Sequence, residues 1–238
     1  MDAAEVSKLA LLEDRHWWYR ERRWLLAREL ERLTGPPGVA VDIGAAGGGN
    51  TRVLREHGWR ELVVEYGEEG ARTAASRGLR TIRADGTALP LRAHSVDLLV
   101  AFDVLEHIDD DRAAAGEIAR VLRPGGTLLV AVPCDMALWS AHDEAVGHFR
   151  RYDRNSLRHL IVGAGLAVEE LRSWNVLLRP VVRLRRRGST ESDLTELHPV
   201  VNAGLTTIIR AERHLPVGGR KGVSLLLRAR RPLDPKPA

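Results

Sequence analysis

Two patterns of hydrophobic and polar positions alternate along residues 39–133 of the chain. Short apolar runs are typical of strands buried on both faces, and the segments between them have the spacing of amphipathic helices. Strands are predicted at residues 39–42, 61–65, 80–84, 96–102 and 127–132, and helices at residues 50–57, 68–76 and 113–122. Strands that alternate with helices in this way predict an α/β fold with a doubly wound parallel sheet.

The residues on either side of this region have other patterns. Residues 3–33 have a helical pattern that Pro36 and Pro37 end, because consecutive prolines cannot continue a helix. Residues 155–164 predict a further helix, and residues 166–173 and 222–229 predict two further strands. The long, mixed segment 176–215 is typical of a functional lid or of a connection with helices of its own.

We therefore expect one domain made of four parts. These are an N-terminal helical cap at residues 1–36, a core at 37–175, an insertion or lid at 176–215, and a final core strand with a flexible tail at 216–238. A chain of 238 residues with 44% hydrophobic content fits a single domain of ordinary size.

Composition and charge narrow the classes of protein that remain. The 36 basic and 32 acidic residues give a mixed surface rather than the basic excess of a nucleic-acid-binding protein. A single cysteine, Cys134, rules out an internal disulfide framework, which fits a reducing cytoplasm. The chain has no signal-peptide pattern and no run of about 18 uncharged apolar residues. We expect a cytoplasmic protein with no transmembrane segment and no nucleic-acid partner, and its oligomeric state is left open.

Acidic residues and glycines follow the predicted strands. The first strand ends in Asp42 and a glycine-dense turn that begins at Gly44, the second ends in Glu65, and the third is followed by Asp85 and Gly86. Ligands of parallel α/β sheets bind beyond the carboxyl ends of the strands. Glycines there let backbone N–H groups approach a ligand closely at a helix N-terminus. This arrangement predicts a site for a nucleotide-like cofactor.

An NAD-binding loop is the main alternative, because Gly44, Ala46 and Gly49 fit the spacing G-x-A-x-x-G. Asp42, however, stands two residues before the first glycine, where its charge would sit poorly beside a pyrophosphate and well near a cationic sulfonium or ammonium group. Glu65 lies at a distance along the chain that suits hydrogen bonds from ribose hydroxyls. The sequence therefore favours a sulfonium cofactor over a dinucleotide.

Four motifs resemble those of class I S-adenosylmethionine-dependent methyltransferases of the type 11 group, similar to the small-molecule methyltransferases of the ubiquinone pathway. The motifs are VDIGAAGGG at 41–49, VVEYGEEG at 63–70, RADGTALPLRAHSVDLLVAFDVLEHI at 83–108 and LRPGGTLLVAVP at 122–133. The resemblance implies S-adenosylmethionine as cofactor and S-adenosylhomocysteine as product. It also implies a Rossmann-like sheet of seven mostly parallel strands, with an N-terminal helical cap and an insertion before the last strand.

The same resemblance implies roles for individual residues of the cofactor site. Asp42 and the loop backbone through Gly44, Ala46 and Gly48 would contact the methionyl portion, and the backbone around Phe102 would complete its ammonium site. The further cofactor residues would be Glu65 on the ribose hydroxyls, Tyr66 against adenine, and Asp85 with the Gly86 amide at the adenine edge.

Two sequence features near the predicted cofactor site have more than one interpretation. The family's middle glycine is Ala46 here, and its methyl group is tolerated if its φ is negative. Tyr19 and Arg23 lie one helical turn apart in a segment that resembles the N-terminal helix of related methyltransferases. Arg23 would reach the cofactor carboxylate. The alternative for this segment is an amphipathic helix whose tryptophans simply bury against the sheet.

The candidate catalytic residues are His107, His148 and Asp143, which follow the fourth and fifth predicted strands. Methyl transfer requires alignment of two reactants and, for some acceptors, removal of a proton. Histidine suits that role because its ordinary pKa is near 6.5. Two structural alternatives stay open: His107 could pack beneath the cofactor, and His148 could anchor its loop through hydrogen bonds.

A divalent metal is a further alternative for this region. Some O- and RNA-methyltransferases with a similar acid-x-x-Glu-His arrangement bind a divalent ion, and Glu106, His107 and a later histidine could supply ligands. Asp103 stands where those relatives carry another glutamate. We therefore expect no metal.

The sequence predicts methyl transfer to a small-molecule acceptor, at oxygen in preference to nitrogen or carbon. The alternatives are an N- or C-methyltransferase of a natural-product or lipid-linked intermediate, and a module that binds the cofactor without turnover. Segment 176–215 combines apolar residues with arginines at 183 and 185–187, so the acceptor is expected to be apolar or anionic. A solvated basic face is the ordinary alternative for those arginines.

Overall fold

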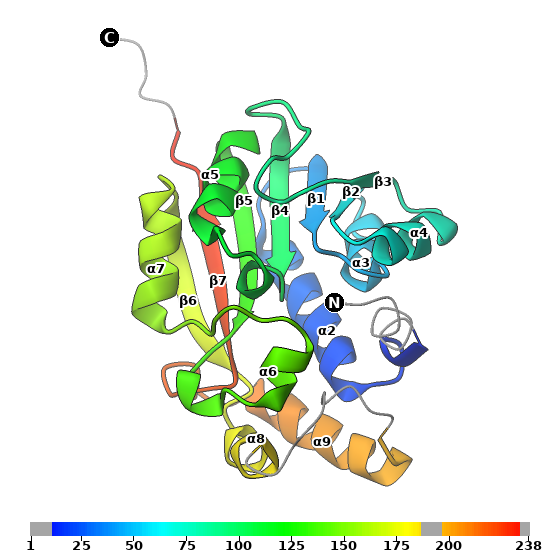
Figure 1. Cartoon of the computed structure of the whole chain (residues 1–238), viewed down its shortest axis with the longest axis vertical. Helices are drawn as coiled ribbons and strands as arrows, with labels where there is room; N and C mark the ends of the chain where they lie inside the picture. The colour runs from blue at the N-terminus through cyan, green and yellow to red at the C-terminus, as the bar shows by residue number, and fades with distance from the viewer. Residues whose placement is uncertain (1–10, 187–196, 234–238) are drawn as a thin grey trace.

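The computed structural model describes residues 11–186 and 197–233, which form a central sheet with helices on both faces (Figure 1). The seven strands lie in the order β3-β2-β1-β4-β5-β7-β6. Their bounds are β1 Val39–Ile43, β2 Arg60–Glu65, β3 Thr81–Arg83, β4 Val96–Phe102, β5 Leu122–Pro133, β6 Ala167–Trp174 and β7 Ser224–Arg230. Strands β1 to β5 are parallel and β7 is antiparallel to both of its neighbours. The predicted mostly parallel α/β sheet of seven strands is confirmed.

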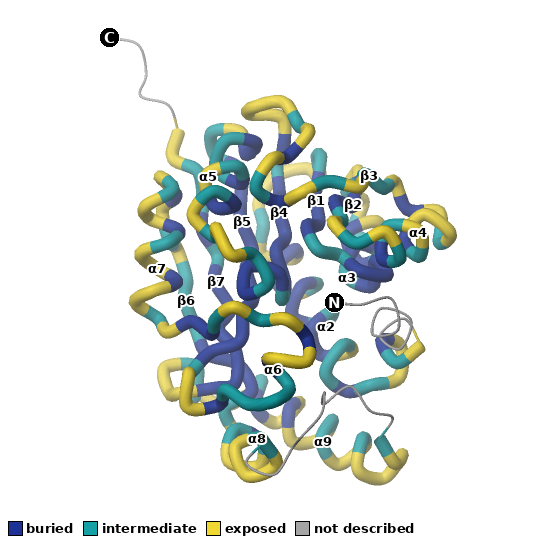
Figure 2. Tube along the Cα trace, in the orientation of Figure 1, coloured by how far each residue is buried: buried dark blue, intermediate teal, exposed yellow. Residues whose placement is uncertain are grey.

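Alternate residues of the central strands enter two different cores, because successive side chains of a strand point to opposite faces. Leu99 of β4 packs in a cluster with residues of α5 (Asp111–Val121) and α7 (Arg154–Gly163). Leu98 packs in a second cluster with residues of α2 (Trp17–Arg32) and α3 (Gly49–Glu56). Strand β4 is buried apart from Asp97, and β5 is buried from Gly126 onwards (Figure 2). The apolar run of β4 is continuous because both of its faces are covered.

Most predicted elements occur within two residues of their expected bounds, and α4 (Glu68–Ser76) matches them at both ends. One difference lies at residues 123–126, expected as a turn before the fifth strand. These residues belong to β5, where the pairing shifts between Val96↔Leu122 and Leu98↔Thr127. Gly125 has φ +79°, a conformation that glycine adopts without steric cost. The turn is therefore a bulge within the strand ladder.

The described part of the insertion forms two helices, α8 (Arg179–Arg186) and α9 (Pro199–Glu212). They lie with α6 (Ala141–Ala145) beyond the carboxyl ends of β1 and β4 (Figure 1). Helix α9 is tied to α2: Arg213, just after α9, donates two hydrogen bonds to Glu21, and the Asn202 side-chain oxygen accepts one from the Trp17 amide at 2.9 Å. The N-terminal helix and the insertion thus close over the same end of the sheet. Residues 3–10, Arg187 and the last five residues of the predicted tail lie outside the described residues.

The division into a cap, a core, a lid and a final strand stays a prediction. Among the helices of the described residues, none is long and apolar enough to cross a membrane.

Candidate active site

The glycine loop between β1 and α3 has three residues with positive φ: Gly44 (64°), Ala46 (45°) and Gly48 (80°). A Cβ atom on Gly44 would collide with the Val104 side chain, and one on Gly48 with Leu79. A negative φ, the condition under which the Ala46 methyl group was expected to be tolerated, is therefore not met. A non-glycine residue in this region costs about 1–2 kcal/mol, because its Cβ crowds the following carbonyl oxygen. The Ala46 amide donates to Glu65 Oε2 at 2.8 Å, which holds the loop in this shape.

Asp42 is buried at the end of β1, where the Thr51 hydroxyl of α3 donates to it at 2.6 Å. Burial raises the pKa of Asp42 to about 7, and the nearby Glu65 carboxylate adds to this rise. The helix N-cap is Gly48, so Asp42 does not cap α3. A cation bound near the loop would stabilise the charged form of Asp42.

The acidic residues after β2 and β3 lie on neighbouring strand ends, since Glu65 is paired with Arg83. The two carboxylate oxygens of Glu65 accept hydrogen bonds from the Ala46 and Gly67 amides, at 2.8 and 3.0 Å. Asp85 is exposed and accepts two hydrogen bonds from Thr87, the larger cause of its lowered pKa. Asp85 is therefore ionised at neutral pH and open to a ligand.

A cavity of about 290 Å³ lies beside the glycine loop. Its wall includes five of the predicted cofactor residues, namely Tyr19, Arg23, Gly44, Ala46 and Phe102, together with the predicted catalytic residues His107 and His148. The remaining predicted site residues, Asp42, Gly48, Glu65, Tyr66, Asp85, Gly86 and Asp143, lie outside this wall. The cavity thus joins the loop to both candidate histidines, and the strand ends of β2 and β3 lie next to it.

Helix α2 contains side chains that pack on the sheet and side chains that line the cavity. Trp17 is buried, and Trp18 and Trp24 pack against the same cluster beneath the helix. Tyr19 and Arg23 line the cavity, and so do Trp17 and Trp18. Arg23 donates to the Glu13 carbonyl oxygen at 2.7 Å, so its guanidinium lies near the glycine loop. The helix both covers the sheet and presents polar groups to the cavity.

Asp143 is the centre of a buried network that orients His148. Its carboxylate accepts hydrogen bonds from Arg151 Nε at 2.8 Å and Arg151 Nη2 at 3.0 Å, and from the Ser140 amide at 3.0 Å. His148 Nδ1 lies 2.8 Å from Asp143 Oδ1, and His148 Nε2 lies 3.9 Å from Glu106 Oε1. Because the carboxylate accepts from Nδ1–H, Nε2 is the nitrogen left to take up a proton.

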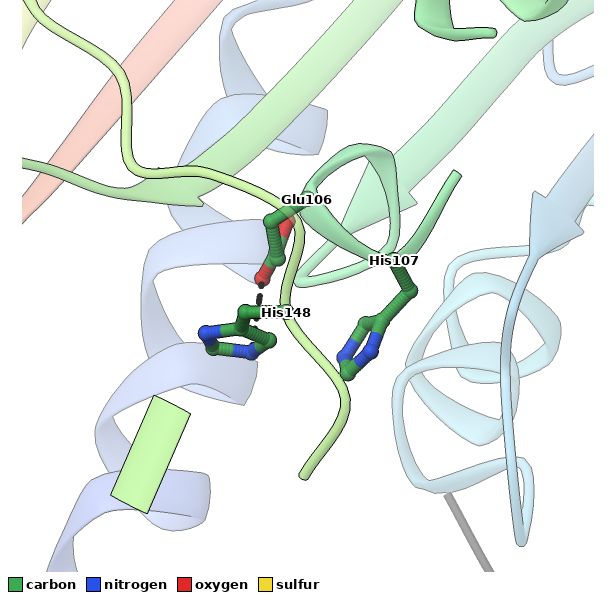
Figure 3. Close-up of side chains that lie close together, drawn as sticks. All are labelled: Glu106, His107 and His148. Carbon is green, nitrogen blue, oxygen red and sulfur yellow. Dashed lines mark ion pairs between the residues drawn. The ribbon is translucent and has the colours of Figure 1, made fainter. Parts of the chain in front are cut away.

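Glu106 and His107 belong to the short helix Leu105–His107 after β4, and their side chains lie next to His148 (Figure 3). Glu106 is fully buried, and its carboxylate oxygens have no hydrogen-bond partner among the described residues. Burial, reinforced by Asp103, raises the pKa of Glu106 well above its ordinary value. Burial lowers the pKa of His107 to about 4, and its ring centroid lies 4.6 Å from that of His148. His107 is therefore neutral near pH 7, and burial favours the neutral form of Glu106.

Glu106, His107 and His148 are also the residues that could hold a metal ion, with candidate ligand atoms within 4.8 Å of one another. Ligands bonded to one tetrahedral zinc ion at about 2.1 Å lie about 3.4 Å apart. The Glu106–His148 separation of 3.9 Å is wider than that. The expectation that no metal is used stays a prediction.

The sequence analysis did not single out three further residues of this site: Arg22, Arg151 and Asn175. Arg22 and Asn175 are buried in the cavity wall, and Arg151 holds Asp143. Asn175 directly follows β6, so the strand-end rule that identified Asp42 would have identified Asn175 as well. Arg22 is adjacent to Arg23, and only the orientation of α2 distinguishes their surroundings.

Comparison with known proteins finds relatives among the methyltransferases. Residues 41–130 match a family model described as Methyltransferase domain. A Mycolicibacterium smegmatis protein named as a probable S-adenosylmethionine-dependent methyltransferase is 29% identical over 163 residues, which cover 67% of this chain and 63% of that protein. These matches support the class I S-adenosylmethionine-dependent methyltransferase that the sequence predicts. S-adenosylmethionine is the cofactor of this family, and the NAD-binding alternative is set aside.

Two solved structures have the same fold. One is the methyltransferase from a Haloferax volcanii complex with the Trm112 methyltransferase activator, with a TM-score of 0.65 and 22% identity, covering 97% of this chain and 96% of that chain. The other is an S-adenosylmethionine-dependent methyltransferase of Mesorhizobium loti, with a TM-score of 0.62 and 19% identity, covering 92% and 100%. The match to the M. smegmatis protein spans less than two thirds of that relative's length.

Proposed function

We propose that this chain transfers the methyl group of S-adenosylmethionine to an oxygen atom of a small-molecule acceptor. The observation that carries the proposal is that one cavity joins the glycine loop to the cavity-facing His148. When bound, S-adenosylmethionine supplies an electrophilic methyl group and leaves as S-adenosylhomocysteine. The chain's own tasks are to bind the two reactants, to align them and to accept the acceptor's proton.

The residues at the strand ends fit the cofactor. Glu65 is half-buried beside the loop, where its carboxylate still has lone pairs free for ribose hydroxyls. Tyr66 and Asp85 are exposed on adjacent strand ends, where they would contact adenine together with the Gly86 amide. Asp42 would favour the cationic methionyl portion, and Arg23 its carboxylate. These roles are the ones that the resemblance implies.

His148 is the proton acceptor in this proposal. Its Nε2 takes the proton from the acceptor oxygen, and Asp143 stabilises the resulting imidazolium through the Nδ1 hydrogen bond. Asp143 acts through His148 and is a positioning residue, which Arg151 in turn holds. His107 lies against His148 and would be a weak base, because burial lowers its pKa to about 4.

The insertion supplies the apolar part of the acceptor site. The cavity wall there includes Leu178, Val181, Val182, Leu197 and Leu205. These side chains support an apolar acceptor of the two kinds expected from the sequence. Arg183 is exposed on the outer side of α8, which favours the ordinary reading of a solvated basic face for that residue.

The proposal is tested in two steps on the purified chain. Calorimetry measures binding of S-adenosylhomocysteine to the unmodified chain. The variant Glu31→Ala, which removes an exposed acidic residue remote from the loop, should bind it equally well. A panel of phenols, alcohols and amines is then incubated with S-adenosylmethionine and analysed by mass spectrometry for a gain of one methyl group. Methylation of a hydroxyl compound supports the proposal. Absence of S-adenosylhomocysteine binding contradicts it, and methylation confined to amines would replace oxygen by nitrogen.

A further inference from the structure

Two polar side chains in the cavity wall, Arg22 and Asn175, are buried and incompletely hydrogen-bonded. Arg22 is 2% exposed, and its Nε and Nη1 atoms have no hydrogen-bond partner among the described residues. Asn175 is 0% exposed, and both atoms of its side-chain amide are likewise unpartnered within the described ranges. A buried polar group without a partner costs about 1–3 kcal/mol. Together these groups offer several donors and one acceptor to a molecule in the cavity.

The two side chains come together because two strands end at the same edge of the sheet. Strand β6 is antiparallel to β7, and β7 is antiparallel to β5, so β6 runs in the direction of β4 and β5. The Arg22 guanidinium lies 5.3 Å from the ring of Phe102, which ends β4, and 5.1 Å from the ring of Trp174, which ends β6. Arg22 therefore spans the strand ends, and Asn175 directly follows one of them.

Two residues at these strand ends have a strained backbone conformation. Asp103 after β4 has φ +56°, and Asn175 after β6 has φ +59°. Non-glycine residues in this region cost on the order of 1–3 kcal/mol and persist where their surroundings hold them. Asp103 is also the ion-pair partner of Arg22. The strained positions thus carry or orient the two incompletely bonded side chains.

The charge of Arg22 is already balanced by a carboxylate. Arg22 is paired with Asp103, and Arg151 with Asp143. A carboxylate placed against Arg22 would bring a second negative charge close to Asp103 in a poorly solvated site, where like charges repel strongly. An uncharged oxygen would accept from Arg22 without that repulsion. The balance therefore favours a neutral hydrogen-bond acceptor.

We propose that Arg22 and Asn175 form a subsite that binds an uncharged carbonyl group of the methyl acceptor. Arg22 Nη1 or Nε and Asn175 Nδ2 donate hydrogen bonds to the carbonyl oxygen. The neighbouring cavity wall includes Trp17, Trp18 and Tyr19, which suit an aromatic ring that carries the carbonyl. This subsite rests on the proposed methyl transfer and specifies the class of acceptor: an aryl ketone, ester or amide with a hydroxyl group elsewhere on the molecule.

The test compares three probes that share a phenol ring and differ in the group opposite the hydroxyl. They are 4-hydroxyacetophenone with a neutral carbonyl, 4-hydroxybenzoate with a carboxylate, and 4-ethylphenol with neither. Calorimetry measures their binding to the chain saturated with S-adenosylhomocysteine, so that no turnover occurs. We expect the ketone to bind at least tenfold more tightly than either of the other two probes, because only the ketone satisfies both side chains without adding charge.

Asn175→Gly is the informative variant, because glycine adopts the positive φ without strain and the fold is retained. The preference for the ketone over 4-ethylphenol should fall at least fivefold, while the affinity for S-adenosylhomocysteine stays unchanged. His94→Gly is the matched control, since His94 is an exposed non-glycine residue with φ +59° outside the cavity wall. It relieves the same kind of strain and should leave all three affinities as they are.

Each other result overturns the carbonyl subsite. A ketone affinity no higher than that of 4-ethylphenol, or a preference that survives in Asn175→Gly, removes it. Tightest binding of 4-hydroxybenzoate would show an anionic acceptor instead. Weaker S-adenosylhomocysteine binding in Asn175→Gly would assign the subsite to the cofactor carboxylate. If the unmodified chain does not bind S-adenosylhomocysteine at all, the proposed function itself fails, which distinguishes that failure from loss of the subsite alone.

Discussion

The cavity has a cofactor side, beside the glycine loop, and an acceptor side, beside Arg22 and Asn175. The two sides differ in how many hydrogen-bond partners their polar groups have. On the cofactor side, Glu65 accepts two backbone amide hydrogen bonds, and Asp42 accepts one from Thr51. On the acceptor side, Glu106, Arg22 and Asn175 are buried with polar atoms that have no partner among the described residues. The cofactor side is therefore built by contacts within the sheet and its loops, and the acceptor side leaves hydrogen-bonding capacity for a ligand.

The largest effect is expected on the acceptor side. His148→Ala should lower the rate of methyl transfer by about 10²–10⁴-fold, because a positioned general base contributes that much. Its affinity for S-adenosylhomocysteine should stay within about twofold, measured by calorimetry beside single-turnover kinetics. His159→Ala is the control, since His159 is exposed on α7. Full activity of the His148 variant would leave His148 with a structural role.

The next effect concerns stability on the cofactor side. The folded chain raises the pKa of Asp42 from 3.8 to about 7, so between these pH values the folded state binds more protons than the unfolded state. The contribution of Asp42 to the unfolding free energy is therefore present at low pH and is lost as pH rises through about 7, by up to roughly 4 kcal/mol. Urea unfolding should show this fall for the wild type and a smaller one for Asp42→Asn. Equal slopes in the two proteins would contradict the shifted pKa.

Cofactor affinity should respond to the two strand-end acids. Asp42→Ala and Glu65→Ala are each expected to weaken S-adenosylhomocysteine binding by about 10- to 100-fold, since each removes a charged hydrogen-bonding group worth about 1.5–3 kcal/mol. Calorimetry with Glu69→Ala as the control measures the loss, because Glu69 lies on α4 in a surface ion pair. Wild-type affinity in both variants would remove the cofactor assignment from these strand ends.

The smallest effect is expected at Ala46. Ala46→Gly should raise the unfolding free energy, because glycine adopts φ +45° without the crowding of a Cβ atom. The gain should be at most about 1 kcal/mol, since glycine also increases the entropy of the unfolded chain. Thermal unfolding measures it against Ala75→Gly in helix α4, which should lose about 1 kcal/mol. A loss of stability in Ala46→Gly would contradict the strained geometry of the loop.

The difference between the two sides also explains what the sequence could predict. Asp42, Glu65 and Asp85 each lie at or just beyond the end of a strand, so the periodicity that locates the strand also locates the residue. The burial of Asn175 depends instead on how α8, α9 and α2 close over the strand end, and such contacts between distant segments leave no local pattern. The orientation of His148 depends on Asp143 and Arg151 of the same short segment, whose side-chain hydrogen bonds follow no helix or strand periodicity.

Two local features were misjudged for a similar reason. Residues 123–126 have the composition of a turn, yet pairing with β4 keeps them within β5 as a bulge. The Ala46 methyl group was expected to be tolerated at negative φ, yet the loop between Gly44 and Gly48 is held at positive φ by the Glu65 hydrogen bond. In both places tertiary contacts outweigh the preference of the individual residues.

The central claim is that the glycine loop and His148 serve a single methyl-transfer site. A crystal structure of the chain with S-adenosylhomocysteine tests it most directly. The account predicts the ribose hydroxyls on Glu65, the methionyl portion along Gly44 and Phe102, and the sulfur atom directed at the space between His148 and Asn175. Binding of S-adenosylhomocysteine elsewhere, or with its sulfur turned away from His148, would contradict the account.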